Sequence, residues 1–347
     1  MSIRWAAALA ALLAAGAAAT AGAAEGGGRA PVAATAHFAF HSDLATNLHD
    51  ALLVAGRARG RGEPEPLRAG GEAECFAALA PAVRAGWERA VDYYAEVLSP
   101  TSWSDDEQFA LRLALAGVED GPDDQATKDV VRVTRGLLAA AQPAYEACRW
   151  PAQDAANRRW IADLLPLLET HEATLARRLE RLYATPWHGL PLDVDVVAHA
   201  PPVGANSILR SPAGGHLLVS VDNRGLQALE TVFHEASHTV SAGWRGDPLP
   251  TALRRAADEL GVELPRDLWH VVLFYTTGET VRRTLAEAGE TGYVPYLEAG
   301  LWDGPWGRFR GAIEAVWPAY LAGERDLASA ARELVRRVAA EAAPSDP

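Results

Sequence analysis

The sequence has few cysteines, a shortage of basic charge and no internal repeat. Its two cysteines, Cys75 and Cys148, are too few for a dense disulfide framework and lack the spacing of a metal-binding pair. Lys and Arg total 32 against 45 Asp and Glu, so the formal net charge of the 347 residues is −13. Because this acidity disfavours polyanions, neither nucleic acid nor an anionic membrane is expected as a partner.

Long apolar runs are also missing, except at the N-terminus. After residue 24 no segment offers the ~20 uninterrupted apolar residues of a membrane-spanning helix. Residues 1–24 combine Arg4, an alanine-rich apolar run and the small residues Ala21-Gly22-Ala23, a pattern typical of a secretory signal peptide. The sequence therefore predicts a secreted or periplasmic protein with no stable membrane association once the signal is removed. In that oxidising compartment Cys75 and Cys148 either form a disulfide or remain free thiols.

The rest of the chain is predominantly helical in pattern. Apolar residues recur every three to four positions over 73–98, 104–117, 125–148 and 151–184. After Pro186 the pattern changes to short runs rich in Val, Ile and Leu, at 192–199, 205–211 and 216–221. We therefore predict a mainly α protein of the α+β class, with a small antiparallel sheet. Residues 25–185 form the predicted N-terminal helical region, and residues 186–347 the predicted catalytic region with C-terminal helices.

The strongest chemical motif is His234-Glu235-Ala236-Ser237-His238, within an apolar helical pattern from Leu226 to Gly243. On a helix, His234 and His238 lie one turn apart on the same face, which suits a tetrahedral zinc ion. Glu235 then faces the same cleft, where it can act as general base on water. The alternative is a buried helix with two hydrogen-bonded histidines and an exposed glutamate.

This HExxH stretch resembles the active-site helix of the zincin superfamily of metallopeptidases. The resemblance covers that helix and, more loosely, the strand before it and the helix after it, roughly a quarter of the chain. A metzincin would carry a glycine and a third histidine where Ser241 and Trp244 stand, so that branch is excluded. The resemblance implies a gluzincin-like site, or an aspartate-ligand variant, beside an edge strand that binds extended peptide. Residues 216–221 are the candidate strand, although a hairpin that only packs on the helix is the alternative.

The resemblance also implies a third zinc ligand on a later element. Our choice is Glu279, because a carboxylate within the apolar helix after Asp267 needs a metal or a cation as partner. A simple ion pair with Arg282 or Arg283 is the alternative. Glu230, one turn before His234, could not easily reach the metal, and the next ligand candidates are Asp258 and Glu259.

Zincins commonly use a Tyr or His side chain to stabilise the oxyanion of the tetrahedral intermediate. Tyr275 and His270 are our candidates for this catalytic role, with Tyr293 and Tyr296 as further possibilities. His270 lies nine residues from Glu279, on the opposite side of an ideal helix, so we do not expect both to bind one metal.

Two other groups of side chains have open roles. His37, His41 and His49 either are ordinary polar residues or line the same cleft as the zinc. A final set of tryptophans is expected to pack the C-terminal helices rather than to bind a sugar: Trp302, Trp306 and Trp317.

Together these features predict a secreted zinc-dependent metallohydrolase, with a peptide or protein as substrate. Zn²⁺ is the expected cofactor, held by His234, His238 and Glu279, and Glu235 is the expected general base. Two alternatives stay open. One is a secreted helical binding protein with a structural or inactive zinc site, and the other is a zinc hydrolase of non-peptide substrates.

Overall fold

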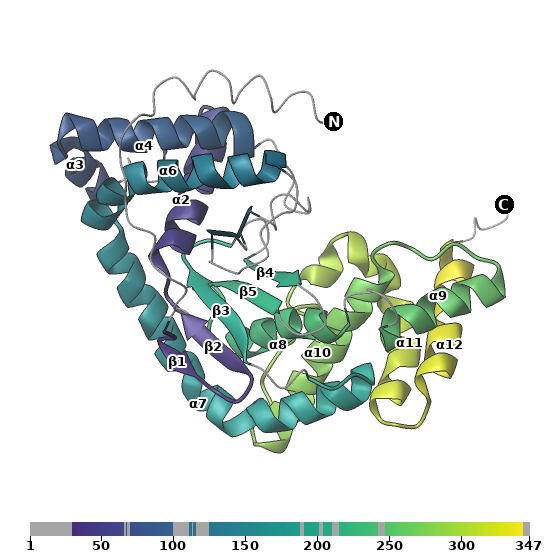
Figure 1. Ribbon diagram of the computed structural model, residues 1–347. Helices are drawn as coiled ribbons and strands as arrows, with labels where there is room; N and C mark the ends of the chain where they lie inside the picture. Colours follow the sequence, from purple (N-terminus) through teal and green to yellow (C-terminus); the bar gives the residue numbers. More distant parts are fainter. Residues whose placement is uncertain are drawn as a thin grey trace.

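The structure is a computed structural model that describes residues 30–65, 67, 70–99, 111–112, 114–115, 125–187, 191–200, 204–209, 215–241 and 247–342. The predicted signal peptide at 1–24 and most of the predicted helix at 104–117 lie outside these residues. The described part is mainly helical and contains a small sheet, as predicted (Figure 1). Within it, no helix is both long enough and apolar enough to cross a membrane.

The described strands form one mixed sheet in the order β1-β2-β3-β5-β4. Strands β2, β3 and β5 are parallel, whereas β1 pairs antiparallel with β2 and β4 pairs antiparallel with β5. The predicted antiparallel arrangement is therefore wrong for the centre of the sheet and right for the β4–β5 hairpin. Two features account for the difference. Strand β4 lies outside β5, so β3 pairs directly and in parallel with β5, and β2, which the sequence pattern did not identify as a strand, joins the sheet in parallel beside β3. The bounds are β1 Ala33–Ala34, β2 Phe38–His41, β3 Leu192–Val197, β4 Ala205–Leu209 and β5 Gly215–Ser220.

The edge strand differs from the predicted one. Residues 216–221 correspond to β5, which is hydrogen-bonded on both sides because it lies between β3 and β4. Strand β4 pairs only with β5 in the described sheet and therefore forms its edge, with Ala205 opposite Val219. Strand β4 precedes β5 in the sequence but lies outside β5, at the edge of the sheet. The spacing of the strands along the sequence does not reveal this order.

The two faces of the sheet pack against different helices. Val194 and Leu217 are buried in a large apolar cluster with α7 (Trp150–Tyr183), α8 (Leu226–Val240) and α10 (Leu268–Glu287). On the opposite face lies α2 (Leu44–Gly60), where Asn47 Nδ2 donates to the Val196 carbonyl at 3.1 Å. Figure 1 shows α8 and α10 next to the sheet, with α7 bending around it. The bend is consistent with Pro166, which cannot donate the helical hydrogen bond at its position.

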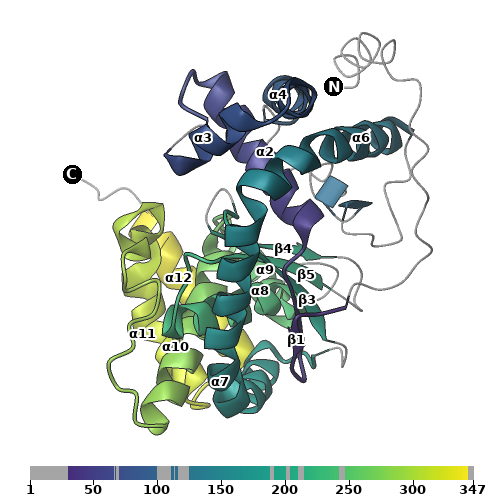
Figure 2. The same ribbon diagram turned by 90° about the vertical axis from the view of Figure 1, so that its left-hand side faces the viewer.

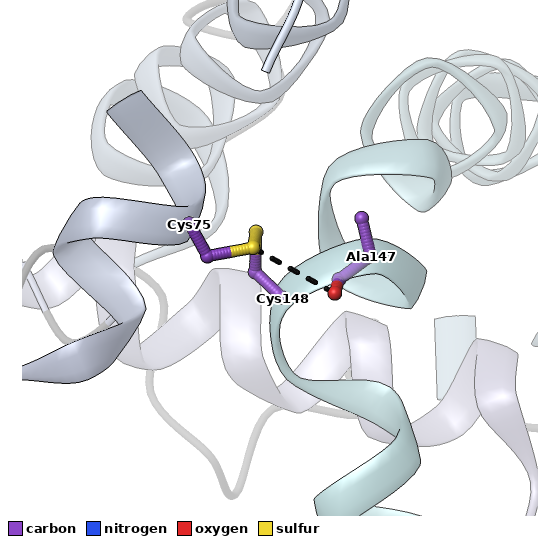
Figure 3. The surroundings of a disulfide bond; sticks show 3 residues. All are labelled: Cys75, Ala147 and Cys148. Carbon is purple, nitrogen blue, oxygen red and sulfur yellow. Dashed lines mark hydrogen bonds between the residues drawn. A yellow bond between two sulfur atoms is a disulfide. The ribbon is translucent and has the colours of Figure 1, made fainter. Parts of the chain in front are cut away.

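The N-terminal helices form a second apolar cluster, drawn at the top of Figure 2. It contains α2, α3 (Gly71–Ala78), α4 (Pro81–Tyr93), the π-helical turn η3 (Tyr94–Leu98) and α6 (Gln125–Cys148). The helix predicted at 73–98 is interrupted at Leu79 and Ala80, because Pro81 disfavours helical geometry at the residue before it. Cys75 and Cys148 form a disulfide between α3 and the end of α6, with their Cα atoms 5.6 Å apart (Figure 3).

These two apolar clusters divide the chain differently from the predicted boundary at residue 185. Trp160, Leu164 and Tyr183 of α7 belong to the cluster of the sheet and the C-terminal half. The remaining elements are α9 (Pro248–Leu260), η4 (Leu301–Asp303), η5 (Pro305–Phe309), α11 (Arg310–Leu321) and α12 (Leu327–Ala342). Helices α9 and α11 and the turn η5 contact α10, whereas α12 packs against α9 and α11. Trp302 and Trp317 are buried in this region, as predicted.

The close packing of α4 against α6 gives a prediction about stability. A Cβ atom at Gly86 would lie 2.3 Å from the carbonyl oxygen of Ala140, whereas one at Gly136 meets nothing within 4 Å. We expect Gly86→Ala to destabilise the protein by about 1–3 kcal/mol, because the two helices must move apart. Gly136→Ala, the matched control, should stabilise it by about 0.5–1 kcal/mol through helix propensity. Urea denaturation of both variants measures the difference, and equal effects would contradict the packing described here.

Candidate metal centre

Three histidine rings converge between α8 and α10. His234 Nε2 lies 3.3 Å from His238 Nε2 and 3.4 Å from His270 Nε2. One nitrogen from each of the three rings falls within a set whose members are all within 4.8 Å of one another. His234 and His238 share a face of α8 because they are one turn apart, and His270 reaches them from the first turns of α10.

This arrangement fits a tetrahedral metal ion. With Zn–N bonds of about 2.0–2.1 Å, two nitrogen ligands of a tetrahedral zinc lie about 3.3–3.4 Å apart. The two Nε2–Nε2 distances from His234, 3.3 and 3.4 Å, match that separation. His234 Nδ1 is buried and has no hydrogen-bond partner in the part of the chain that the structure describes. A metal ion at the point where the three rings converge would accept a lone pair from each Nε2 atom.

The protonation state of the three histidine rings is also the one that metal binding requires. Burial, with a smaller contribution from His270, lowers the pKa of His238 to about 3, and burial lowers the pKa of His270 to about 4 against the opposing effect of Asp267. For His234, burial first and then the two other histidines hold the pKa well below its usual value. The rings are therefore neutral at pH 7, which is the form of histidine that binds metals.

Glu279, the predicted third ligand, does not belong to this cluster. Its carboxylate accepts from Arg282 Nε at 2.8 Å and Nη2 at 2.5 Å, and Arg283 Nε lies 3.9 Å away. The ion pair, our alternative, is what the structure contains. The physical reason is helix geometry, since nine residues of α10 place Glu279 about 180° around the axis from His270. The two residues do lie on opposite sides, but His270 is the one that faces α8.

Asp258 and Glu259, the next ligand candidates, are also elsewhere. Both are exposed on α9, and Glu259 pairs with Arg332 of α12 at 2.5 Å. Tyr275, a predicted catalytic residue, does not line the cavity at the histidines. It follows His270 by five residues, so it points about 140° away around the helix, while Phe274 takes the position one turn after His270.

Glu235 lies beside the three histidines in the same cavity and is only 7% exposed. The Ser207 hydroxyl, on β4, donates to its carboxylate and lies 2.9 Å from its backbone carbonyl oxygen. Burial raises the pKa of Glu235 to about 7, and the Ser207 hydrogen bond opposes that rise. A carboxyl with a pKa near neutrality can both accept and return a proton under ordinary conditions.

The cavity has a volume of about 540 Å³ and is lined by two kinds of side chain. We call the polar group, Ser207 of β4, Asn223, Thr231 and Tyr296, the polar wall. The apolar wall consists of Trp269, Phe274 and Trp306 from α10 and η5, whose rings contact the histidines. Ser207 and Phe274 were not among the predicted site residues, and Trp306 was predicted to pack the C-terminal helices. The i,i+4 spacing of His270 and Phe274 was the available signal that both share the face of the metal centre.

Phe274 and Trp269 hold two of the histidine rings in place. The Phe274 ring stacks on His234 with centroids 3.5 Å apart and an interplanar angle of 26°. Trp269 stacks on His270 at 5.2 Å and 27°. Such ring contacts restrict the rotamers of the two histidines, so their Nε2 atoms stay aimed at a common point.

The remaining candidates for the oxyanion-stabilising role differ in whether they line the cavity. Tyr296 and His270 line the cavity, whereas Tyr293 points away and donates its hydroxyl to Glu230. The Tyr296 hydroxyl donates to Asn223 Oδ1, so it must break that bond before it can donate to a substrate. His270 Nε2 lies 3.4 Å from His234 Nε2, within the histidine cluster, so its predicted role as an oxyanion donor stays a prediction beside that of a metal ligand.

The N-terminal histidines do not reach the cavity. His37 Nδ1 lies 2.7 Å from Glu172, His41 Nε2 lies 2.8 Å from Asp193, and His49 Nδ1 lies 2.7 Å from the Tyr94 hydroxyl. Each therefore has a local polar partner, and the interpretation that they line the metal cleft is wrong.

Glu230 is a fully buried carboxyl one turn before His234. It accepts from the Tyr293 hydroxyl and lies 3.3 Å from the backbone N–H of Tyr296. A Cβ atom at Gly278 of α10 would come within 3.0 Å of Glu230 Oε1, so the glycine permits this close approach. Glu230 thereby ties the segment that carries Tyr296 to α8.

Glu230 gives a pH-dependent prediction. Burial raises its pKa from 4.5 to about 7, so the folded protein binds a proton there that the unfolded chain has released. Its contribution to the free energy of unfolding is therefore fully present below pH 4.5 and is lost as pH rises through 7. At about 1.4 kcal/mol per pKa unit, the loss is about 3 kcal/mol. Urea titrations of metal-free wild type and Glu230→Gln should show their stability difference shifting by that amount between pH 4 and 8. Parallel pH profiles would contradict the assignment.

Comparisons of the chain with protein-family models, with curated proteins and with solved structures gave no match.

Proposed function

We propose that this protein is a metal-dependent hydrolase, with zinc as the metal and a peptide bond as the target. The observation that carries the proposal is the convergence of three neutral imidazoles on one point, with a buried carboxyl, Glu235, in the same cavity. In a catalytic zinc site three protein ligands leave one position open, while a structural site uses four. Among the described residues, the ligand cluster has three members.

The chemistry then divides between the metal and Glu235. Bound at the three histidines, zinc would act as a Lewis acid and lower the pKa of a coordinated water. Glu235 is placed to accept a proton from water in the cavity and to donate it to the leaving amine. Ser207 holds the Glu235 carboxyl in place through its hydroxyl proton.

The zincin resemblance supports this proposal with one change in the ligand set. The HExxH residues occupy one helix as in that superfamily, but His270 replaces the predicted carboxylate ligand. A site with three neutral ligands keeps the full charge of the metal, whereas a glutamate would neutralise half of it. We also propose that the protein works outside the cytoplasm, which the disulfide between Cys75 and Cys148 supports.

The test uses metal removal. Purified protein is incubated with a mixture of denatured proteins, and the products are identified by mass spectrometry. We expect cleavage that stops after dialysis against a chelator and returns with one equivalent of Zn²⁺. Zinc binding without hydrolysis of peptides would favour the binding-protein alternative, and hydrolysis of small esters or amides alone would favour a non-peptide substrate.

A further inference from the structure

We infer that the cavity selects a substrate with a large apolar side chain next to the bond that is cleaved, and that Trp306 and Leu301 form the surface that contacts this side chain. The inference rests on the proposed function and names its substrate class. Three features of the cavity support the inference. The side chains of its polar wall are already hydrogen-bonded within the protein, the side chains of its apolar wall are partly exposed, and its volume suits one large side chain.

The polar wall is already hydrogen-bonded within the protein. Asn223 Nδ2 donates to the Gly204 carbonyl at 2.9 Å, and Asn223 Oδ1 accepts from the Tyr296 hydroxyl. Thr231 Oγ1 lies 2.9 Å from the Gln227 carbonyl. The Asn223 Nδ2 protons and the hydroxyl protons of Tyr296 and Thr231 are therefore already used, and an acceptor on a ligand reaches them only by displacing an existing hydrogen bond, which reduces the net gain.

The apolar wall is incompletely covered. Trp269, Phe274 and Trp306 are all partly exposed although they pack on one another and on the histidines, with Trp306 and Phe274 centroids 5.5 Å apart. At the mouth of the cavity Leu301 is 36% exposed, and it and Val294 are the large apolar side chains most exposed in the described part of the chain. Exposed apolar area of this kind beside a polar site marks the place where a ligand buries apolar surface.

The size of the cavity agrees with a substrate that carries one large apolar side chain. Its volume of about 540 Å³ falls within the range of about 300–1,000 Å³ found for sites that enclose small ligands. It can hold the reacting amide and one large side chain. Glu235 is the only Asp, Glu, Lys or Arg among the described lining residues, so the cavity offers no further charged group to pair with a charged substrate side chain. Such a side chain would lose its hydration without a dedicated partner.

Binding can be measured separately from catalysis in the zinc-loaded Glu235→Gln variant. Two blocked hexapeptides are titrated by calorimetry, identical except that the central pair is Phe-Leu in one and Glu-Lys in the other. We expect the Phe-Leu peptide to bind at least about tenfold more tightly, since even one methylene changes discrimination by about 10- to 200-fold in an apolar pocket. Equal affinity, or tighter binding of the Glu-Lys peptide, would overturn the inference.

Leu301 and Val294 provide a matched pair of substitutions, because both side chains are exposed and neither belongs to the buried core. Leu301→Ala should weaken binding of the Phe-Leu peptide about three- to tenfold, while Val294→Ala should leave it unchanged. Trp306→Ala should cost more than Leu301→Ala. If Val294→Ala weakens binding as much as Leu301→Ala, the proposed contact surface is wrong. Failure of wild type to hydrolyse any peptide would instead refute the proposed function, so the two failures are distinguishable.

Discussion

Replacing His270 with alanine should abolish tight zinc binding while Glu279→Gln leaves it intact. His270 Nε2 is 3.4 Å from His234 Nε2, whereas the Glu279 carboxylate is bound to Arg282 on the opposite side of α10. Loss of a group that only orients a ligand already costs about 10- to 100-fold in metal affinity. We therefore expect His270→Ala to lose at least about 100-fold, measured by competition with a chromophoric chelator.

The Glu279→Gln variant is the matched control. Its cost is the loss of a partly exposed ion pair, about 1 kcal/mol of stability, with no change in zinc affinity. The result would be reversed, with Glu279→Gln losing zinc and His270→Ala retaining it, if the ligand set were the one that the zincin resemblance implied. Far-UV circular dichroism of both variants checks that each remains folded.

Glu235→Gln should lower kcat by about 10²- to 10⁴-fold without releasing zinc, because the amide cannot accept a proton from water. The substitution keeps the size of the side chain and an oxygen that can accept from Ser207. Single-turnover kinetics on a peptide identified in the cleavage assay, together with elemental analysis, separates the chemical step from metal loss.

Ser207→Ala provides a graded comparison for Glu235→Gln. The hydroxyl of Ser207 donates to the Glu235 carboxylate, but the base itself remains when that hydroxyl is removed. We expect a decrease in kcat that is clearly smaller than that of Glu235→Gln. A Glu235→Gln enzyme with wild-type kcat would show that another group takes the proton.

The sequence predicted the parts of the site that lie on one helix. His234, Glu235 and His238 are adjacent in sequence and in space, because helical periodicity alone sets their relation. Asn223 and Tyr296, by contrast, meet only because β5 and the segment after α10 approach each other across the cavity. No local pattern encodes such contacts.

Helical periodicity alone could not identify the third metal ligand. The periodicity of α10 placed His270 and Glu279 on opposite faces, which the structure confirms. Choosing between the faces required knowing which one packs on α8, and the sequence pattern offers apolar residues on both. Glu279 is buried, but its partner is an arginine one turn along its own helix, the commonest local way to neutralise a carboxylate.

The sheet shows a similar division between local and long-range information. The β4–β5 hairpin follows from two short apolar runs separated by a Pro- and Gly-containing turn. The parallel pairing of β2 with β3 joins residues separated by more than 150 positions, such as Phe38 and Leu192. Only the tertiary fold determines that pairing, and with it the choice of β4 as the edge that carries Ser207 into the site.

X-ray absorption spectroscopy at the zinc edge tests the central claim most directly. In the wild-type protein loaded with one equivalent of zinc, we expect three imidazole ligands at about 2.0–2.1 Å and one oxygen ligand from water. The His270→Ala variant, loaded with excess zinc, should show two imidazoles. A wild-type spectrum with two imidazoles and a carboxylate, or the absence of any specifically bound zinc, would contradict the three-histidine centre.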